Sequence, residues 1–236
     1  MKALRTLRAK LCAYAIVFLA TIGLGANPLL AGSSDFTGIY IAGHASINGI
    51  AMDGSHSDGK GAITKGTAGA LIPLAGYEAG VNLPLGPNFF VTIGASQVSG
   101  SADVFRADDT KDNANVVVRA KDYTSVFIQP AISLWDNAAV FVKMGLVHSD
   151  LEAFGDITSQ PDNLSGTTYA IGTQTMSNAG LFMKTEAGAT VFDHFYMTGV
   201  GEGDSNNANQ AQKGGDTNVQ GDPLAAYGRV TIGFKF

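Results

Sequence analysis

Five charged residues stand out because they interrupt segments in which apolar side chains occupy every second position. All five fall on the positions between the apolar ones: Glu78, Lys143, Lys184, Glu186 and Arg229. Successive side chains of a β-strand point to opposite faces, so these charges would share one face of their strands and the apolar residues the other. Carboxylates and cations gathered on one face can form ion pairs or line a selective pore. Which of the two they do depends on the strands that hold them.

The histidines and serines form no catalytic or metal-binding pattern. His44, His56, His148 and His194 show no metal-ligand spacing with each other or with carboxylates. His148 and Ser149 are adjacent, so in a strand they would face opposite sides. The segment Ser177-Asn178-Ala179-Gly180 resembles part of the outer-membrane lipid A deacylases, but Thr175 stands where that segment has its histidine. Without a base the serine has no activator, and the sequence predicts neither an enzyme nor a cofactor.

The charges lie in a chain that reads as a succession of strands. Eight segments alternate apolar and polar residues, at about 37–50, 69–83, 89–103, 116–134, 138–153, 176–191, 195–203 and 224–236. Short turns at about 84–88, 135–137 and 192–194 alternate with long polar stretches at about 53–68, 104–115, 154–175 and 204–222. Such alternation is typical of transmembrane β-barrels, whose short turns and chain ends are periplasmic. Pro73 and Pro130 lack a backbone N–H, so we expect a bulge or a local break in pairing at each.

The last nine residues, Gly228 to Phe236, alternate most clearly. Val230, Ile232, Phe234 and Phe236 share one face, whereas Arg229, Thr231, Gly233 and Lys235 share the other. This segment resembles the C-terminal strand of bacterial outer-membrane β-barrels, whose final Phe and alternating apolar positions are recognised by the barrel-insertion machinery. The resemblance implies that these four apolar residues form an insertion signal.

The N-terminus has the pattern of a secretory signal peptide. Lys2, Arg5, Arg8 and Lys10 precede an apolar run from Leu11 to Ala26. We expect residues 1–31 to be removed, with a cut after Gly25 as the alternative. The run is short for the roughly 20 apolar residues of a spanning helix, which disfavours an uncleaved anchor. The mature region, 32–236, is then one barrel domain with four long extracellular loops.

Removal of residues 1–31 also changes the charge and the cysteine content. It takes four of the 15 basic residues and none of the 20 acidic ones, which leaves a formal net charge of −9. An acidic surface argues against nucleic acid as a partner. Cys12 is the single cysteine, so the mature region has no thiol or disulfide.

Aromatic residues provide a further test of the barrel. Several lie beside predicted short turns or chain ends, among them Phe36, Phe89, Phe90, Trp135, Phe192 and Phe195. Membrane barrels carry aromatic girdles at both interfaces, whereas a soluble sandwich would bury most aromatics between its sheets. A soluble β-sandwich or a lipocalin is the disfavoured alternative.

Across the mature region the chain resembles the small opacity and OmpA-like outer-membrane barrels, often described as porin-family proteins. The resemblance implies an all-β fold, an eight-stranded antiparallel up-and-down transmembrane β-barrel in a Gram-negative outer membrane. It also implies export through the periplasm, with outer-membrane lipid and the insertion machinery as partners.

In such a barrel the five charges converge. Each lies roughly six to eight positions from the nearest predicted periplasmic turn or terminus, which corresponds to a height of about 15–20 Å. Charges of both signs in one layer predict an ion-paired plug, because an unpaired charge in a narrow lumen is costly. The alternative is a selectivity ring.

Two functions remain open. In the first, the barrel is a structural or surface-interaction protein that anchors its loops. In the second, it is a narrow porin-like channel for small solutes. The loops are rich in Gly, Asp, Asn, Ser and Thr, so they would be solvated and exposed. Their low-complexity runs would serve either as variable display or as a site for Ca²⁺ or for a host or environmental ligand.

Overall fold

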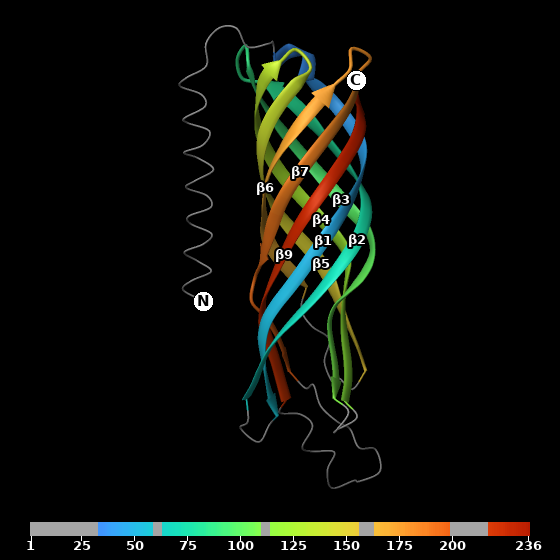
Figure 1. Cartoon of the computed structure of the whole chain (residues 1–236), viewed down its shortest axis with the longest axis vertical. Helices are drawn as coiled ribbons and strands as arrows, with labels where there is room; N and C mark the ends of the chain where they lie inside the picture. The colour runs from blue at the N-terminus through green and yellow to red at the C-terminus, as the bar shows by residue number, and fades with distance from the viewer. Residues whose placement is uncertain (1–32, 59–62, 110–113, 156–162, 199–216) are drawn as a thin grey trace.

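The computed structural model describes residues 33–58, 63–109, 114–155, 163–198 and 217–236 (Figure 1). One short 3₁₀ helix, η1, precedes the strands. In chain order the elements are η1 (Ser33–Phe36), β1 (Gly38–Asp58), β2 (Ile63–Pro84), β3 (Phe89–Asp109), β4 (Ala114–Trp135), β5 (Ala138–Gly155), β6 (Leu164–Met176), β7 (Leu181–Phe192), β8 (Phe195–Thr198) and β9 (Thr217–Lys235). No helix of the described residues is long and apolar enough to cross a membrane.

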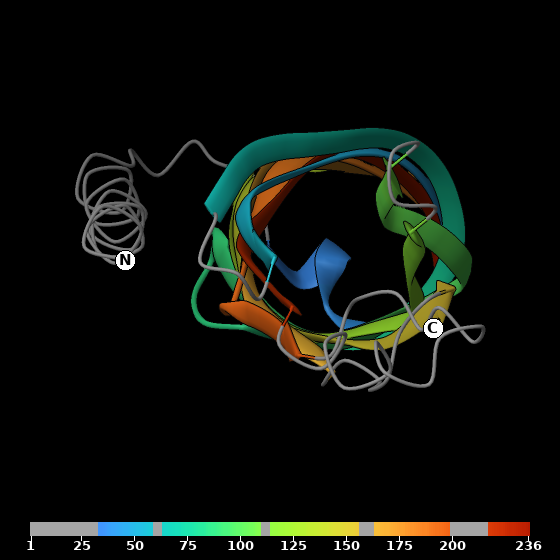
Figure 2. The ribbon, with the colours of Figure 1, turned by 90° about the horizontal axis from the view of Figure 1, so that it is seen from below.

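The strands close into an antiparallel barrel. The ring runs β1-β2-β3-β4-β5-β6-β7-β9, and β9 pairs back onto β1 from Tyr40↔Lys235 onward. The short strand β8 is not counted in this ring of eight. It pairs with β9 on the same edge as β7, beyond the end of the β7–β9 ladder. Figure 2 looks along the barrel and shows the ring with η1 inside it. The predicted all-β, eight-stranded up-and-down barrel is confirmed.

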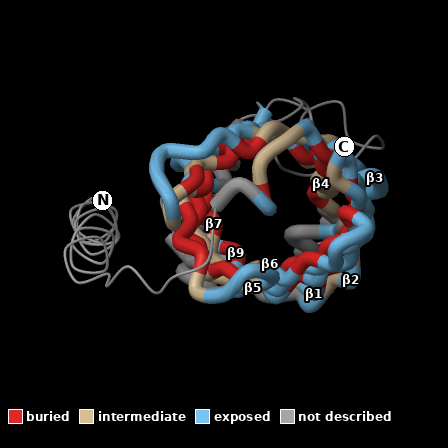
Figure 3. The backbone as a smooth tube through the Cα atoms, turned by 90° about the horizontal axis from the view of Figure 1, so that it is seen from above, coloured by how far each residue is buried: buried red, intermediate tan, exposed pale blue. Residues whose placement is uncertain are grey.

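Many large apolar side chains of the strands are exposed on the outside of the ring, and buried and exposed residues lie close together along the strands in Figure 3. On β9, Val230, Ile232, Phe234 and Phe236 are 45%, 56%, 43% and 69% exposed, while Thr231 is buried between them. The same alternation holds on β1 and β5. An exposed belt of this kind is stable only against hydrocarbon, because water would penalise so much contiguous apolar surface. Ile132 has the same parity along β4 as the exposed Val126 and Ile128, yet it is buried, two residues after Pro130.

One barrel strand was missed, and one predicted strand is too short to be part of the ring. The segment 154–175 was predicted to be a long loop, but it contains β6, which pairs with β5 and with β7. The short periplasmic turn lies at 177–180, where the Ser177 N–H donates to the Leu181 carbonyl at 2.7 Å. The predicted turn at 192–194 therefore lies at the opposite end of β7. The predicted barrel strand at 195–203 is only the four-residue β8.

The strands are also longer than predicted. β1 extends to Asp58 and β2 begins at Ile63. In the same way, β3 extends to Asp109 and β4 begins at Ala114. Strands of up to 22 residues correspond to a barrel height of about 55 Å at ordinary rise and tilt, more than twice an apolar band of about 25 Å. The half of the barrel away from the chain ends therefore extends beyond the membrane. The predicted signal peptide and much of the predicted loop at 204–222 lie outside the described residues.

In the periplasmic half every strand of the ring pairs with both neighbours, whereas beyond it some of these ladders end. β2 and β3 pair from Pro84↔Phe90 only as far as Ala75↔Ser99, although both strands continue. The β5–β6 ladder ends at Ser149↔Leu164, where β6 begins, whereas β5 continues to Gly155. The far half therefore consists of two sheets, β2-β1-β9-β8 and β3-β4-β5, whose strand ends lie apart at the bottom of Figure 1.

Both predicted proline breaks coincide with interrupted pairing. Pro73 pairs with Ile47 on β1, but the β2–β3 ladder ends two residues before it. Pro130 pairs with Val91 on β3, whereas Gln129 and Pro130 are missing from the β4–β5 ladder. The expectation of a local break at each proline is confirmed.

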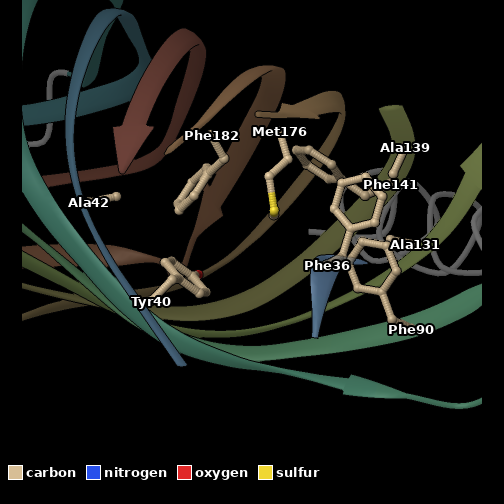
Figure 4. Packing of buried hydrophobic residues seen from close by; sticks show 9 residues of the cluster. All are labelled: Phe36, Tyr40, Ala42, Phe90, Ala131, Ala139, Phe141, Met176 and Phe182. Carbon is tan, nitrogen blue, oxygen red and sulfur yellow. The ribbon is translucent and has the colours of Figure 1, made fainter. Parts of the chain in front are cut away.

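Two apolar clusters fill the interior on either side of its middle. The periplasmic cluster contains Phe36, Tyr40, Ala42, Phe90, Ala131, Ala139, Phe141, Met176 and Phe182 (Figure 4). In it Phe36 stacks on Phe90 with ring centroids 5.0 Å apart. The extracellular cluster contains Val118, Val147, Leu151, Leu164, Phe192, Phe195 and Ala225. The predicted girdle positions of Phe36, Phe90, Phe192 and Phe195 are therefore wrong, since all four rings are buried inside.

Candidate functional site

The structure brings the five predicted interior charges together between the two apolar clusters. They come from four strands: Glu78 from β2, Lys143 from β5, Lys184 and Glu186 from β7, and Arg229 from β9. None is more than 6% exposed. Inward parity alone accounts for this burial, because each alternates with residues of the lipid-facing belt. We refer to these five residues as the charge layer.

Glu78 is the most connected member of the layer. Its carboxylate accepts hydrogen bonds from the Tyr40 hydroxyl at 2.8 Å and from Lys143 Nζ at 3.1 Å, and it also pairs with Lys184. Its side chain is fully buried. A buried carboxylate is stable only when its oxygens are matched by donors, and three donors from three other strands meet that need.

Glu186 lies on the other side of the layer. It contacts Lys143 Nζ at 3.2 Å and Arg229 Nη1 at 3.4 Å. Glu186 and Arg229 are direct cross-strand partners, since β7 pairs with β9. A barrel strand at 195–203, as predicted, would have separated them, but β9 pairs directly with β7. Arg229 also lies 4.0 Å from Glu78, so its nearer partner is Glu186.

Aromatic rings enclose the cations. Lys143 Nζ lies 3.9 Å from the centroid of Phe127, and Lys184 Nζ lies 4.8 Å from that of Tyr40. A cation over a ring face gains electrostatic stabilisation, which is larger when water is excluded. The role of Tyr40 was not predicted. Alternation along β1 indicates that Tyr40 faces the interior. It does not indicate that the Tyr40 hydroxyl donates to Glu78.

Among the described residues, the histidines and serines singled out in the sequence do not come together in one site. Ser149 is buried and His148 is exposed, as opposite parity requires. His148 instead lies near Ser165 and Asp150 on the outer surface. Ser177 belongs to the periplasmic turn, and the side chain of His56 is not among those described. Within the described residues, no group of three His, Cys, Asp or Glu side chains is arranged to hold a metal ion.

An apolar chamber lies on the extracellular side of the charge layer. Its volume is about 70 Å³, and most of the surface that lines it is apolar, although Asn48, Ser149 and Thr190 also line it. Val118, Leu151, Phe192 and Ala225 line it, together with Tyr123 toward the layer. Leu74, Val98 and Gly100 also line it, and these residues lie where β2 and β3 stop pairing.

Comparison with known proteins supports the fold. No protein-family model matches the chain, and no curated protein matches it in sequence. Among solved structures it is similar to the outer membrane protein OprG from Pseudomonas aeruginosa, at 13% identity and a TM-score of 0.50, over 85% of this chain and 97% of that one. It also matches Ail, the attachment invasion locus protein of Yersinia pestis, at 13% identity and a TM-score of 0.38, over 79% and 98% of the two chains.

The chain has the fold of a small outer-membrane β-barrel. The closed ring and the exposed apolar belt require a membrane around the periplasmic half of the strands. Single-chain barrels of this kind are built into bacterial outer membranes, and this protein resides there.

Proposed function

We propose that the protein is an outer-membrane barrel whose lumen is plugged by the charge layer and does not act as an open pore. The pairing of Glu78 and Glu186 with Lys143, Lys184 and Arg229 supports closure. The periplasmic aromatic cluster adds a second barrier below the layer. A water-filled path for ions would have to break buried ion pairs, which is costly in an interior this narrow.

We further propose that the extracellular half binds small apolar molecules and exchanges them with the outer leaflet. The observation that carries this proposal is the end of β2–β3 pairing at Ala75↔Ser99, beside the residues that line the apolar chamber. On β1 this level corresponds to Ala45, the partner of Ala75, which lies seven residues above Gly38, or about 18 Å at ordinary rise and tilt, within the outer half of an apolar band of about 25 Å. A ligand could therefore pass from the chamber into lipid without crossing the plug.

Binding of xenon, an apolar atom small enough for a chamber of about 70 Å³, to the barrel in lipid nanodiscs tests the chamber. Ala225 lines the chamber, whereas its neighbour Ala226 faces lipid. Ala225→Phe should fill the chamber and lower the saturable binding at least tenfold, while Ala226→Phe should leave it unchanged. Equal binding by wild type and both variants would contradict the proposal.

Planar-bilayer conductance tests the plug against the narrow porin-like channel. The closed layer predicts no stepwise ion conductance from the wild-type barrel. A selective channel predicts steady conductance whose ion preference shifts when Arg229 is changed.

A surface-interaction role for the loops stays a hypothesis. Most of the predicted loop at 204–222 lies outside the described residues, and the first two connections contain more strand than predicted. Loss of cell-surface or matrix binding after replacement of residues 199–216 by a short Gly-Ser linker would support that role.

A further inference from the structure

A second polar site adjoins the charge layer on the inner wall of β1 and β9. His44 and Thr231 are cross-strand partners, and Arg229 is the neighbouring inward residue of β9. The three side chains are 5%, 0% and 6% exposed. On its other side Thr231 is the cross-strand partner of Lys184. The imidazole of His44 lies over Gly76, where a Cβ would come within 2.7 Å of the ring, so the glycine makes room for it.

These three residues carry buried donors without protein partners. Within the described part of the chain, the unpartnered buried side-chain atoms include both ring nitrogens of His44, Oγ1 of Thr231 and Nε of Arg229. The guanidinium Nε–H and the threonine hydroxyl can donate, and a neutral imidazole keeps one N–H. Buried polar groups in native proteins almost always have partners, so neighbouring unpartnered donors point to a bound acceptor.

The charge of the layer indicates what kind of acceptor. It holds three cations, Lys143, Lys184 and Arg229, but only two carboxylates, Glu78 and Glu186, which leaves one excess positive charge. No other acidic side chain among the described residues is buried. An unbalanced charge is expensive in a water-poor interior. One bound monoanion would neutralise the layer, whereas a water molecule would satisfy the donors but leave the charge.

We infer that His44, Thr231 and Arg229 form a binding site for a small inorganic monoanion, which under cellular conditions is chloride. Thr231 Oγ1 and Arg229 Nε donate to it, a ring N–H of His44 is the third donor, and Lys184 on the neighbouring strand adds positive charge. The interior of an eight-stranded barrel is filled by side chains, which favours a monatomic ion over a larger oxyanion. This inference goes beyond the proposed closure of the lumen: it uses only the charges of the layer and is independent of the apolar chamber.

Urea unfolding of the intact barrel at constant ionic strength tests the site. Chloride is replaced stepwise by gluconate, an anion too large to enter. Above the dissociation constant, each tenfold rise in chloride should lower the unfolding equilibrium constant about tenfold in the wild type, as expected for one ion bound only by the folded state. Thr231→Val and His44→Phe should lose most of this dependence.

Thr92→Val is the matched control. Thr92 is also an inward threonine with 0% exposure, but its hydroxyl donates to Asn82 Oδ1 at 2.7 Å, so this variant should be less stable and keep the full chloride dependence. A crystal grown in bromide should show an anomalous peak beside Thr231.

An unfolding constant that does not respond to chloride, or one that responds equally in wild type and Thr231→Val, would overturn the inference, as would a bromide crystal with only water at the site. Stepwise ion conductance with intact chloride dependence would refute the closed plug and leave the anion site standing.

Discussion

At the scale of single residues, Arg229 forms two ion pairs of different length within the charge layer. Arg229 contacts Glu186 at 3.4 Å and Glu78 at 4.0 Å, and all three side chains are buried. A buried charge that loses its partner keeps its desolvation cost. The main contribution of Arg229 to stability is therefore that it pairs with Glu186, which would otherwise lose one of its partners while buried.

We predict that Arg229→Ala lowers the free energy of unfolding by about 3–5 kcal/mol, the range for breaking a buried pair. The double variant with Glu186→Ala should cost less than the sum of the two single changes, and pairing with Glu78→Ala should show weaker coupling. A double-mutant cycle in urea measures both terms. Additive changes in both cycles would contradict a paired layer.

The exposed pair on the outer surface provides the control for that measurement. Arg119 contacts Asp103 at 2.8 Å, but both side chains are more than a third exposed. Solvent screens such a pair, so Arg119→Ala should cost no more than about 1 kcal/mol. A loss as large as that of Arg229→Ala would show that burial does not distinguish the two sites.

Residue parity was sufficient to select the members of the layer but not their contacts. Charged residues on inward positions of strands must face the interior, whichever strands neighbour each other, so the five could be chosen from alternation alone. The height of Lys184 and Glu186 was counted from a turn at 192–194, yet the true periplasmic turn is at 177–180. Counted from Gly180, Glu186 is still six residues up its strand, whereas Lys184 is only four, or about 10 Å instead of 15–20 Å.

At the scale of elements, β6 was missed because its outward face is mostly hydroxylic. Thr167, Thr173 and Thr175 occupy positions that elsewhere in the barrel hold aliphatic residues. The hydroxyl groups of Thr173 and Thr185 form a hydrogen bond between β6 and β7, with their oxygens 2.9 Å apart. Threonine suits a pleated strand through its branched Cβ, but it carries little hydropathy, so alternation of apolar residues could not reveal this strand.

The corrected order of strands predicts which chain segments share a side of the membrane. Residues 32–236 contain no cysteine, so a cysteine introduced there is the only thiol of the predicted mature region. His194→Cys, in the exposed turn after β7, should react with an impermeant maleimide on intact cells, whereas Asn178→Cys should react only after permeabilisation. Protection at His194 together with labelling at Asn178 would restore the order that the sequence alone favoured.

The opening between β2 and β3 can be tested by disulfide formation. Ala79 and Ala95 are paired across these strands, so cysteines there should oxidise readily, given the short Cα separation that a disulfide requires. Leu71 and Asp103 would be partners if the same register continued, but the strands do not pair there. Their cysteines should oxidise at least tenfold more slowly, as measured by gel mobility. Equal rates would mean that the wall is closed.

At the scale of the whole molecule, the fold was predictable because it depends on a signal distributed along the chain. Closure of the ring joins β1 to β9, and the belt of exposed aliphatic residues continues across that seam. The far half was not predictable, since the length of a strand beyond the membrane is not set by lipid and leaves no apolar alternation. Its split into two sheets depends on where pairing stops, and only Pro73 marked one of those places.

Assembly of the whole barrel should depend on its last strand. Val230, Ile232, Phe234 and Phe236 all face outward, and β9 joins β1 to β7. Replacing Phe234 and Phe236 with Ser should lower the amount of heat-modifiable, membrane-integrated protein at least several-fold and leave periplasmic degradation products. The matched control is Ile39→Ser with Ile41→Ser, which removes two exposed aliphatic residues from the neighbouring strand without altering the C-terminus. If the signal proposed for the terminal residues is correct, the control should assemble far better. Equal loss in both variants would instead mean that assembly senses only the total apolar area of the belt.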